Sequence, residues 1–223
     1  MIDFHCHVLP GIDDGSRNVD TSVRMLEMSK EQGVERMIAT PHFYAEEMSI
    51  QGFLERRQAA YERLTGDERY NGLPLSLGAE VAFFQGIADA DRVHDLCMGG
   101  GRVMLLEMPF HDWTPRELQE VEALMKDHGI NILFAHLERF MERSNMRMVE
   151  RALKTDALVQ INAEAFASRR LKKKLIGLFM AMREITLPEL NGYDFCASHG
   201  IFSSERDVKA AVAYDLQQEM RYK

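Results

Sequence analysis

The sequence lacks the patterns of several protein classes. No run approaches the roughly 20 apolar residues of a membrane span, so we expect no membrane insertion. No charged and then apolar leader precedes the first apolar stretch, and a cytoplasmic protein is therefore expected. Only three cysteines occur, without CxxC spacing, which argues against a disulfide framework or a thiolate zinc site. Cys6, Cys97 and Cys196 are instead expected to be small buried hydrophobes.

Nucleotide-binding loops and nucleic-acid signals are also missing. No GxxxxGK[ST] or GxGxxG motif follows a predicted strand. The formal net charge of -8 opposes general binding to nucleic-acid phosphates, so no nucleic-acid partner is expected. One basic run, 169–174, is interpreted first as the solvated side of an amphipathic helix, with a docking patch for an acidic partner as the minor alternative. The fifteen methionines are compatible with a homo-oligomer interface, although filling gaps in the core is their commoner use.

Short apolar runs alternate with segments of helical periodicity, and no linker-like or low-complexity stretch separates them. The predicted strands are 2–6, 34–40, 75–81, 103–108, 130–135, 157–162 and 193–198. The predicted helices are 21–32, 52–64, 85–96, 115–128, 145–154, 168–183 and 204–220. This alternation predicts an α/β protein with parallel strands, in one domain over residues 1–223. Seven units favour a closed or nearly closed barrel; an open doubly wound sheet is the alternative.

The stretch His5-Cys6-His7 places two imidazoles one residue apart at the end of the first predicted strand. Because alternate side chains of a strand share one face, His5 and His7 look the same way and can bind one metal ion. An isolated pair of this kind is more often merely solvated. A metal site needs further ligands from elsewhere in the chain.

The carboxyl ends of the other strands supply such residues, and in parallel α/β folds these ends meet at one edge. The ligand-type residues found at these ends are His5, His7, His42, Glu80, Glu107, His136 and His199. The sixth strand is the exception, since it ends in Gln160-Ile161-Asn162, which are polar but poor metal ligands. Three further histidines, His94, His111 and His128, fall in predicted helices or a loop and are expected at the surface.

Asp13 and Asp14 follow the first strand and add carboxylates at the same edge. Alone, their Asp-Gly turn would be an ordinary loop, but beside His5 and His7 we expect one of them to be a ligand. So many imidazoles and carboxylates exceed the roughly four ligands of one zinc ion. The sequence therefore predicts two or three divalent ions, and nitrogen and oxygen ligands suit manganese, iron or zinc.

Closely spaced divalent ions activate water and stabilise both oxygens of an in-line displacement, which favours phosphoester hydrolysis. A cyclic-amide or peptide hydrolase could use similar ions. Arg139, three residues after His136, favours phosphate because a guanidinium grips phosphate oxygens in pairs. Its alternative is a surface arginine paired with Glu138 or Glu142. Arg206 is a second, weaker candidate for binding phosphate.

Together, the motifs DFHCHVLPGIDDG, ATPHF, GAEV, LLEMPF, AHLERF, QINAEAF and ASHG resemble the polymerase and histidinol phosphatase (PHP) superfamily. Within it, they are similar to the metal-dependent bacterial protein-tyrosine phosphatases encoded with capsule and exopolysaccharide genes. The resemblance implies a distorted TIM-like (β/α)7 barrel, the PHP fold, with a trinuclear, often manganese, site. It also implies a substrate, the phosphotyrosine tail of a bacterial tyrosine kinase that controls polysaccharide synthesis.

The resemblance further implies roles for individual residues. His5, His7 and Glu80 would bind one ion, and Glu80, Glu107 and His136 a second. The third ion would be bound by Asp14 (or Asp13), His42 and His199. Arg139 matches an arginine that the family uses for phosphate. Arg139, Asp14 and His42 are thus the expected catalytic residues, and Arg139 and Arg206 the expected substrate-binding residues.

One departure from the family pattern concerns the seventh strand. The family has Ser-Asp-Ala-His there, whereas this chain has Cys196-Ala197-Ser198-His199, so Ala197 replaces an aspartate ligand. We expect retained metal and reduced or altered phosphatase activity, since the other ligand positions are intact. Two other functions compete: a small-molecule phosphatase of the histidinol-phosphate kind, and a non-catalytic module that binds a phosphorylated kinase tail. Cysteine-based catalysis is set aside, because no C-x5-R motif occurs.

Overall fold

The computed structural model describes residues 2–142 and 146–160. Within them, parallel strands form a three-stranded sheet of order β1-β2-β4 and a five-stranded sheet of order β3-β5-β6-β7-β8. The strands are β1 (Ile2–Cys6), β2 (Arg36–Ala39), β3 (His42–Phe43), β4 (Leu75–Leu77), β5 (Glu80–Ala82), β6 (Val103–Glu107), β7 (Asn131–Phe134) and β8 (Leu158–Val159). The mixed α/β architecture with parallel strands agrees with the prediction from the sequence.

The two sheets are joined through two interrupted strands. The chain passes from β2 to β3 through Thr40 and Pro41, and from β4 to β5 through Gly78 and Ala79. Across these breaks the N–H of Gly78 donates to the carbonyl of Ala39 (2.8 Å) and the N–H of Glu80 donates to that of Pro41 (3.0 Å). Because Pro41 has no N–H, the regular ladder is interrupted there. These two hydrogen bonds nevertheless connect the three-stranded sheet with the five-stranded sheet, and the strands stay parallel across the break.

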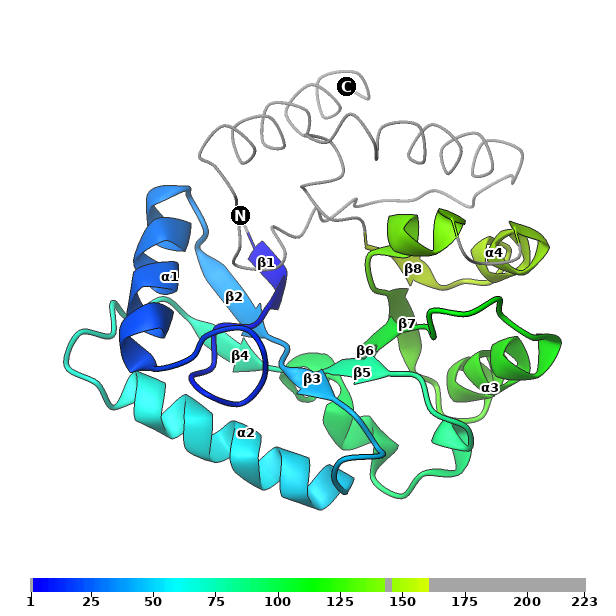
Figure 1. Ribbon diagram of the computed structural model, residues 1–223, viewed down its shortest axis with the longest axis horizontal. Coiled ribbons are helices and arrows are strands. Elements are labelled where there is room, and N and C mark those ends of the chain that lie inside the picture. The colour runs from blue at the N-terminus through cyan, green and yellow to red at the C-terminus, as the bar shows by residue number, and fades with distance from the viewer. Residues whose placement is uncertain (1, 143–145, 161–223) are drawn as a thin grey trace.

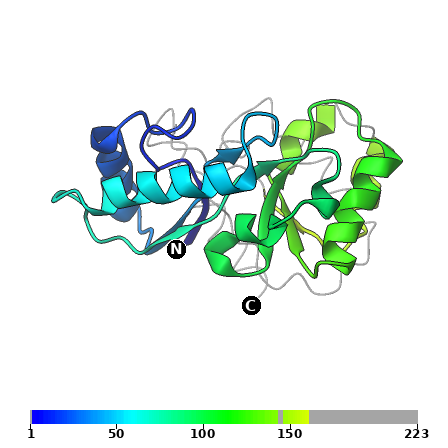
Figure 2. The ribbon, with the colours of Figure 1, turned by 90° about the horizontal axis from the view of Figure 1, so that it is seen from below.

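In the described part of the chain, four α-helices lie around the outside of the strands (Figure 1). They are α1 (Val19–Glu31), α2 (Ile50–Thr65), α3 (Pro115–Lys126) and α4 (Met146–Leu153). Figure 2 shows α1 and α2 beside β1 and β2 in one half of the described chain, and α3 beside β6 and β7 in the other. No helix of these described residues is long and apolar enough to cross a membrane.

The start of α3 is fixed by a reciprocal capping interaction. The N–H of Glu117 donates to Thr114 Oγ1 (3.3 Å), and the N–H of Thr114 donates to Glu117 Oε2 (2.6 Å). Pro115 takes the first helical position, where a missing N–H costs nothing. Two backbone donors at the helix end are thereby satisfied.

Thr114→Ala is expected to lower the free energy of unfolding by about 1 kcal/mol, because the N–H of Glu117 loses its acceptor. Thr114→Ser keeps a hydroxyl and is the matched control. Urea denaturation of both variants measures the effect. Equal unfolding midpoints for the alanine and serine variants would contradict the capping role.

Within residues 2–142 and 146–160, two large apolar clusters lie on either side of the junction between the two sheets. The first surrounds β5, β6, β7 and α3 and includes Phe134 and Leu106. The second lies between β1, β2, α1 and α2 and includes Leu26 and Met37. A third, small cluster takes side chains from both sheets, with Phe4 of β1 packed against a group that contains Leu133 of β7. The two halves therefore share apolar contacts as well as backbone hydrogen bonds.

Several elements differ from the sequence prediction. The helix predicted over 85–96 is wrong: this stretch forms two short 3-10 turns, Ile87–Asp89 and Val93–Leu96. Gly86 and Arg92 have φ of 83° and 64°, so left-handed backbone interrupts the helical pattern. The strand predicted over 75–81 is divided into β4 and β5, and β3 was not predicted. The last predicted strand and the last two predicted helices lie outside the described residues.

Candidate metal centre

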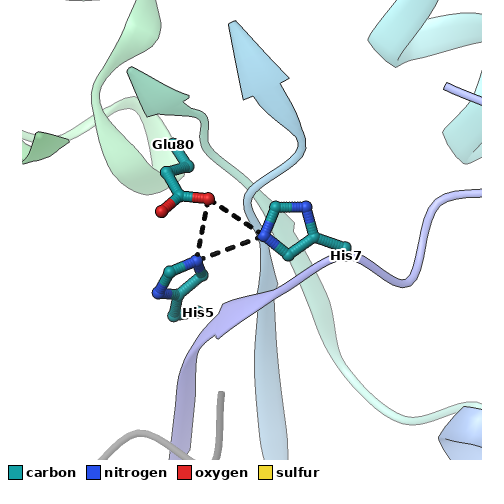
Figure 3. A group of neighbouring side chains, drawn as sticks. All are labelled: His5, His7 and Glu80. Carbon is teal, nitrogen blue, oxygen red and sulfur yellow. Dashed lines mark hydrogen bonds and ion pairs between the residues drawn. The ribbon is translucent and has the colours of Figure 1, made fainter. Parts of the chain in front are cut away.

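Glu80, the first residue of β5, has a fully buried side chain at the centre of the expected site. Its Oε2 lies 3.1 Å from each of three imidazole nitrogens, namely His5 Nε2, His7 Nε2 and His42 Nδ1. Figure 3 shows His5 of β1 and His7 just after it directed toward this carboxylate. One buried oxygen thus brings together residues that come from three separate parts of the chain.

The other carboxylate oxygen of Glu80 lies toward the ends of β6 and β7, two further strands of the same sheet. Its Oε1 lies 2.7 Å from Nε2 of His136, which follows β7. The same His136 nitrogen lies 3.3 Å from Oε1 of Glu107, the last residue of β6. Glu107 and His136 are both buried. These contacts extend the cluster from the end of β1 across the ends of β5, β6 and β7.

Asp13 and Asp14 occupy different positions, which distinguishes the two carboxylates that the sequence left open. Asp13 Oδ2 accepts from His7 Nδ1 (2.6 Å) and from the backbone N–H of His42 (3.1 Å), while its Oδ1 accepts from Gly15 N–H (3.0 Å). Asp14 is exposed, with Oδ1 3.6 Å from His42 Nε2. Asp13 therefore orients His7, and Asp14 is the carboxylate available as a ligand at the rim.

The carboxylates of Glu80 and Asp13 and the imidazole of His7 stabilise each other's charged forms, whereas His5 is held neutral. Burial alone would raise the pKa of Glu80, but the charge of His5 and contacts with His136 and His7 hold it well below its usual value. Burial likewise opposes charge on His7, yet Asp13 and Glu80 raise its pKa to about 10. For His5, burial outweighs the attraction of Glu80 and lowers the pKa. In the metal-free protein His7 is therefore protonated on both ring nitrogens, and a bound cation would take the place of the proton on Nε2.

The arrangement fits divalent cations. In the part of the chain that the structure describes, three groups of side chains offer ligand atoms within 4.8 Å of one another: His5, His7 and Glu80; His7, Asp14 and His42; and His42, Glu80 and Glu107. His7, His42 and Glu80 each belong to two groups, so neighbouring ions would share ligands. Among the described residues, Glu80 Oε2 and His42 Nδ1 are buried without a hydrogen-bond partner, although they lie 3.1 Å apart. A bound cation would give both atoms a partner, because a buried carboxylate oxygen and an imidazole nitrogen can each donate a lone pair to it.

Of the remaining expected site residues, some are described by the structure and others are not. Arg139 lies in the 3-10 turn Leu137–Glu142, where its backbone N–H donates to the carbonyl of His136 (2.9 Å) and its side chain is half-buried. His199, Arg206 and Ala197 lie outside the described residues. Cys6 and Cys97 are free and buried, as expected.

Sequence reasoning missed two features of the loop after β1. The orienting role of Asp13 has no local signal, because Asp13 and Asp14 have the same chemistry and adjoin the same turn. Gly15 was interpreted only as part of a turn, yet a Cβ there would lie 2.3 Å from His7 Cβ and 2.4 Å from its carbonyl oxygen. The loop thus packs against His7 so closely that only glycine fits.

Comparisons with known proteins agree with this site. The chain is 28% identical to "Tyrosine-protein phosphatase YwqE" of Bacillus subtilis over 229 residues, covering 98% of this chain and 85% of that protein. It is 25% identical to "Tyrosine-protein phosphatase CpsB" of Streptococcus pneumoniae, covering 97% and 82%. "Putative tyrosine-protein phosphatase CapC" of Staphylococcus aureus is 23% identical, with 79% and 72% covered.

A solved structure shows the same fold. This structure is described as one of the "crystal structures of YwqE from Bacillus subtilis and CpsB from Streptococcus pneumoniae, unique metal-dependent tyrosine phosphatases". The TM-score is 0.67 at 23% identity, over 97% of this chain and 93% of that one. Residues 1–179 match the family model described as "Capsular polysaccharide synthesis, CpsB/CapC". The resemblance inferred from the motifs is thereby confirmed, and the chain belongs to the CpsB/CapC family of capsular polysaccharide synthesis.

Proposed function

We propose that this protein is a metal-dependent phosphoester hydrolase that removes phosphate from tyrosine residues of proteins. The observation that carries the proposal is Glu80 Oε2, buried 3.1 Å from three imidazole nitrogens in a member of the CpsB/CapC family. Several relatives of the chain are named as tyrosine-protein phosphatases, which gives the substrate class. A solved structure of the same fold is described as metal-dependent.

In this proposal two or three divalent ions, with manganese preferred and iron or zinc as alternatives, are bound by eight residues. These are His5, His7, Asp14, His42, Glu80, Glu107, His136 and His199. Such ions would lower the pKa of a water molecule and neutralise charge that develops on the phosphate. The buried carboxylates Glu80 and Glu107 would balance part of the positive charge of such ions. Asp13 keeps His7 Nε2 directed toward Glu80.

Substrate binding in this proposal depends on cationic and rim residues. Arg139 follows His136 by three residues and is only half-buried, so its guanidinium is available to a phosphate group beside the cluster. Arg206 is proposed as a second phosphate-binding residue. Asp14 and His42 lie at the rim, where Asp14 is exposed. They are proposed as catalytic residues with Arg139, next to the bound phosphate.

The proposal extends to the finer features that the family resemblance implies. The described strands would be part of a distorted TIM-like (β/α)7 barrel, in one domain over residues 1–223. The substrate would be the phosphotyrosine tail of a bacterial tyrosine kinase of polysaccharide synthesis, encountered in the cytoplasm. The PHP-type phosphatases share this metal chemistry with enzymes for small phosphate esters, so substrate size is the property to test.

Removal of metal is expected to abolish hydrolysis of a phosphotyrosine peptide, and added Mn²⁺ should restore it. Chelation by EDTA followed by dialysis and titration with Mn²⁺ measures this, with released phosphate as the readout. Histidinol phosphate is the comparison substrate and should react more slowly than the peptide. Faster release from histidinol phosphate would favour the small-molecule phosphatase. Full activity in EDTA would contradict metal dependence.

Ala197 supports a second candidate, a regulatory module that binds the phosphorylated tail with little hydrolysis. Ala197→Asp is expected to increase metal content and turnover, because it adds the carboxylate that the family pattern has at this position. Ala197→Asn, which has a similar size without the charge, is the matched control. Elemental analysis and phosphate release measure both. Identical metal content and turnover in the wild type and the aspartate variant would show that the substitution has no consequence.

A further inference from the structure

Gln160, directly after β8, is held in place by its own backbone. Its N–H donates to the carbonyl of Phe134 (2.9 Å), and its carbonyl accepts from the N–H of Leu137 (3.1 Å). The residue is 1% exposed. These bonds place the side-chain amide between β1 and the end of β7, where Oε1 lies 2.7 Å from the backbone nitrogen of His136 and 3.2 Å from His5 Nδ1.

The contact with His136 determines which way the amide of Gln160 points. A backbone N–H can only donate, so the side-chain atom that faces it must be the oxygen. The same oxygen faces His5 Nδ1, and an acceptor at 3.2 Å requires a proton on that nitrogen. A neutral imidazole carries one N–H, so a proton on Nδ1 leaves the lone pair of Nε2 for a bound cation. Without a cation, the ionised Glu80 Oε2, 3.1 Å from Nε2, competes for the same proton. The carbonyl oxygen has two lone pairs, enough for both donors.

The lone pair of His5 Nε2 is then directed toward the centre of the cluster. Nε2 lies 3.1 Å from Glu80 Oε2 and 3.2 Å from His7 Nε2. His7 is in a parallel situation, because the ionised carboxylate of Asp13 can only accept and therefore requires a proton on His7 Nδ1. Two neighbouring histidines thus have their orientation set by two different residues, Asp13 in the loop after β1 and Gln160 after β8.

Gln160 also stabilises an unusual backbone conformation. His136 has φ of 33°, in a region that non-glycine residues seldom adopt, and its N–H is the donor to Gln160. Such a conformation persists only where the surroundings hold it. We propose that Gln160 is a positioning residue of the metal centre, whose single carbonyl oxygen holds His5 as the Nδ1–H tautomer and fixes the backbone of His136. This inference rests on the metal dependence in the proposed function, and is independent of the identity of the substrate.

Three variants separate positioning from simple packing. Gln160→Met has nearly the same length and no acceptor oxygen, so it removes the hydrogen bonds with little change in volume. Gln160→Glu restores an acceptor that both donors can use. Val159→Ala, a partly buried neighbour on β8, removes packing while leaving the acceptor in place. It is the control for general destabilisation of the strand.

The ring-nitrogen chemical shifts of ¹⁵N-labelled protein loaded with diamagnetic Zn²⁺ report whether His5 carries its proton on Nδ1. We expect a protonated Nδ1 and a metal-bound Nε2 in the wild type, Gln160→Glu and Val159→Ala, and a mixture of states in Gln160→Met, where Nδ1–H has lost its acceptor. Affinity for Mn²⁺, measured by calorimetry, should fall about 10- to 100-fold in Gln160→Met, as for other residues that orient a metal-binding histidine. It should recover to within about threefold of the wild type in Gln160→Glu, which keeps the acceptor.

The inference is overturned if Gln160→Met keeps both the wild-type tautomer and the wild-type affinity. It is equally overturned if Val159→Ala weakens Mn²⁺ binding as much as Gln160→Met, or if Gln160→Glu fails to restore it. Should these results appear as expected while the wild type releases no phosphate from phosphotyrosine, the positioning role stands and the proposed reaction is wrong. The two proposals are thereby tested separately.

Discussion

Glu80→Gln is expected to abolish tight metal binding and to lower phosphotyrosine turnover by at least about 1,000-fold, the factor that corresponds to roughly 4 kcal/mol of lost transition-state stabilisation. The carboxylate belongs to two of the three ligand groups and faces three imidazole nitrogens at 3.1 Å. An amide is neutral, and its NH₂ group cannot accept a hydrogen bond or bind a cation. The side chain keeps its size, so the loss comes from charge rather than from packing.

The matched control for this substitution is Glu31→Gln, which removes one negative charge from the exposed end of α1. Its metal content and turnover should equal those of the wild type. Elemental analysis after dialysis and steady-state kinetics on a phosphotyrosine peptide provide the measurements. A Glu80→Gln protein that retains bound metal and wild-type turnover would show that the cluster around Glu80 is not the reaction centre.

Gly15→Ala is expected to destabilise the protein by roughly 1–3 kcal/mol through overpacking, and to weaken metal binding at the same time. The added Cβ would lie 2.3 Å from His7 Cβ and 2.4 Å from the His7 carbonyl oxygen, so neither the loop nor the histidine can stay in place. The backbone N–H of Ser16 donates to that same carbonyl (3.0 Å), and this bond would be strained as well. Any shift of His7 moves its Nε2 away from Glu80.

Gly52→Ala tests the same chemical change where space exists. A Cβ at Gly52 meets only Ser49 Oγ at 3.4 Å, an ordinary contact, and alanine favours the helix in which it lies. This variant should be as stable as the wild type or slightly more so, with unchanged affinity for Mn²⁺. Thermal unfolding with and without Mn²⁺ compares the two. Equal stability and affinity of both alanine variants would contradict the close packing of the loop on His7.

The main features of the site followed from sequence because few residue types can hold a metal. Strand periodicity predicted that His5 and His7 share a face, and apolar runs typical of buried parallel strands precede Glu80, Glu107 and His136. The structure brings all five together, as expected. Where local rules suffice, sequence and structure agree: the helix predicted to begin at residue 115 does begin there, at Pro115 of α3.

Features that depend on distant contacts were not predictable. The stretch 85–96 has helical periodicity, but left-handed backbone at Gly86 and Arg92 divides it into short turns. Gln160 was interpreted only as a poor metal ligand, and nothing in the sequence indicates its contact with His5, 155 positions away. Asp13 and Asp14 are equivalent in sequence, and only the position of His7 separates them.

The position of the cluster between the two large apolar clusters has a consequence for folding. His5 and His7 adjoin the half built on β1 and β2, whereas Glu107 and His136 belong to the half built on β6 and β7. Glu80 contacts histidines of both. If the proposed cations bind here, their occupancy would be thermodynamically linked to the packing of one half of the described chain on the other. The ions that would promote hydrolysis would then also stabilise the packing of the two halves. Loss of these ions would lower the free energy of unfolding as well as the rate of hydrolysis.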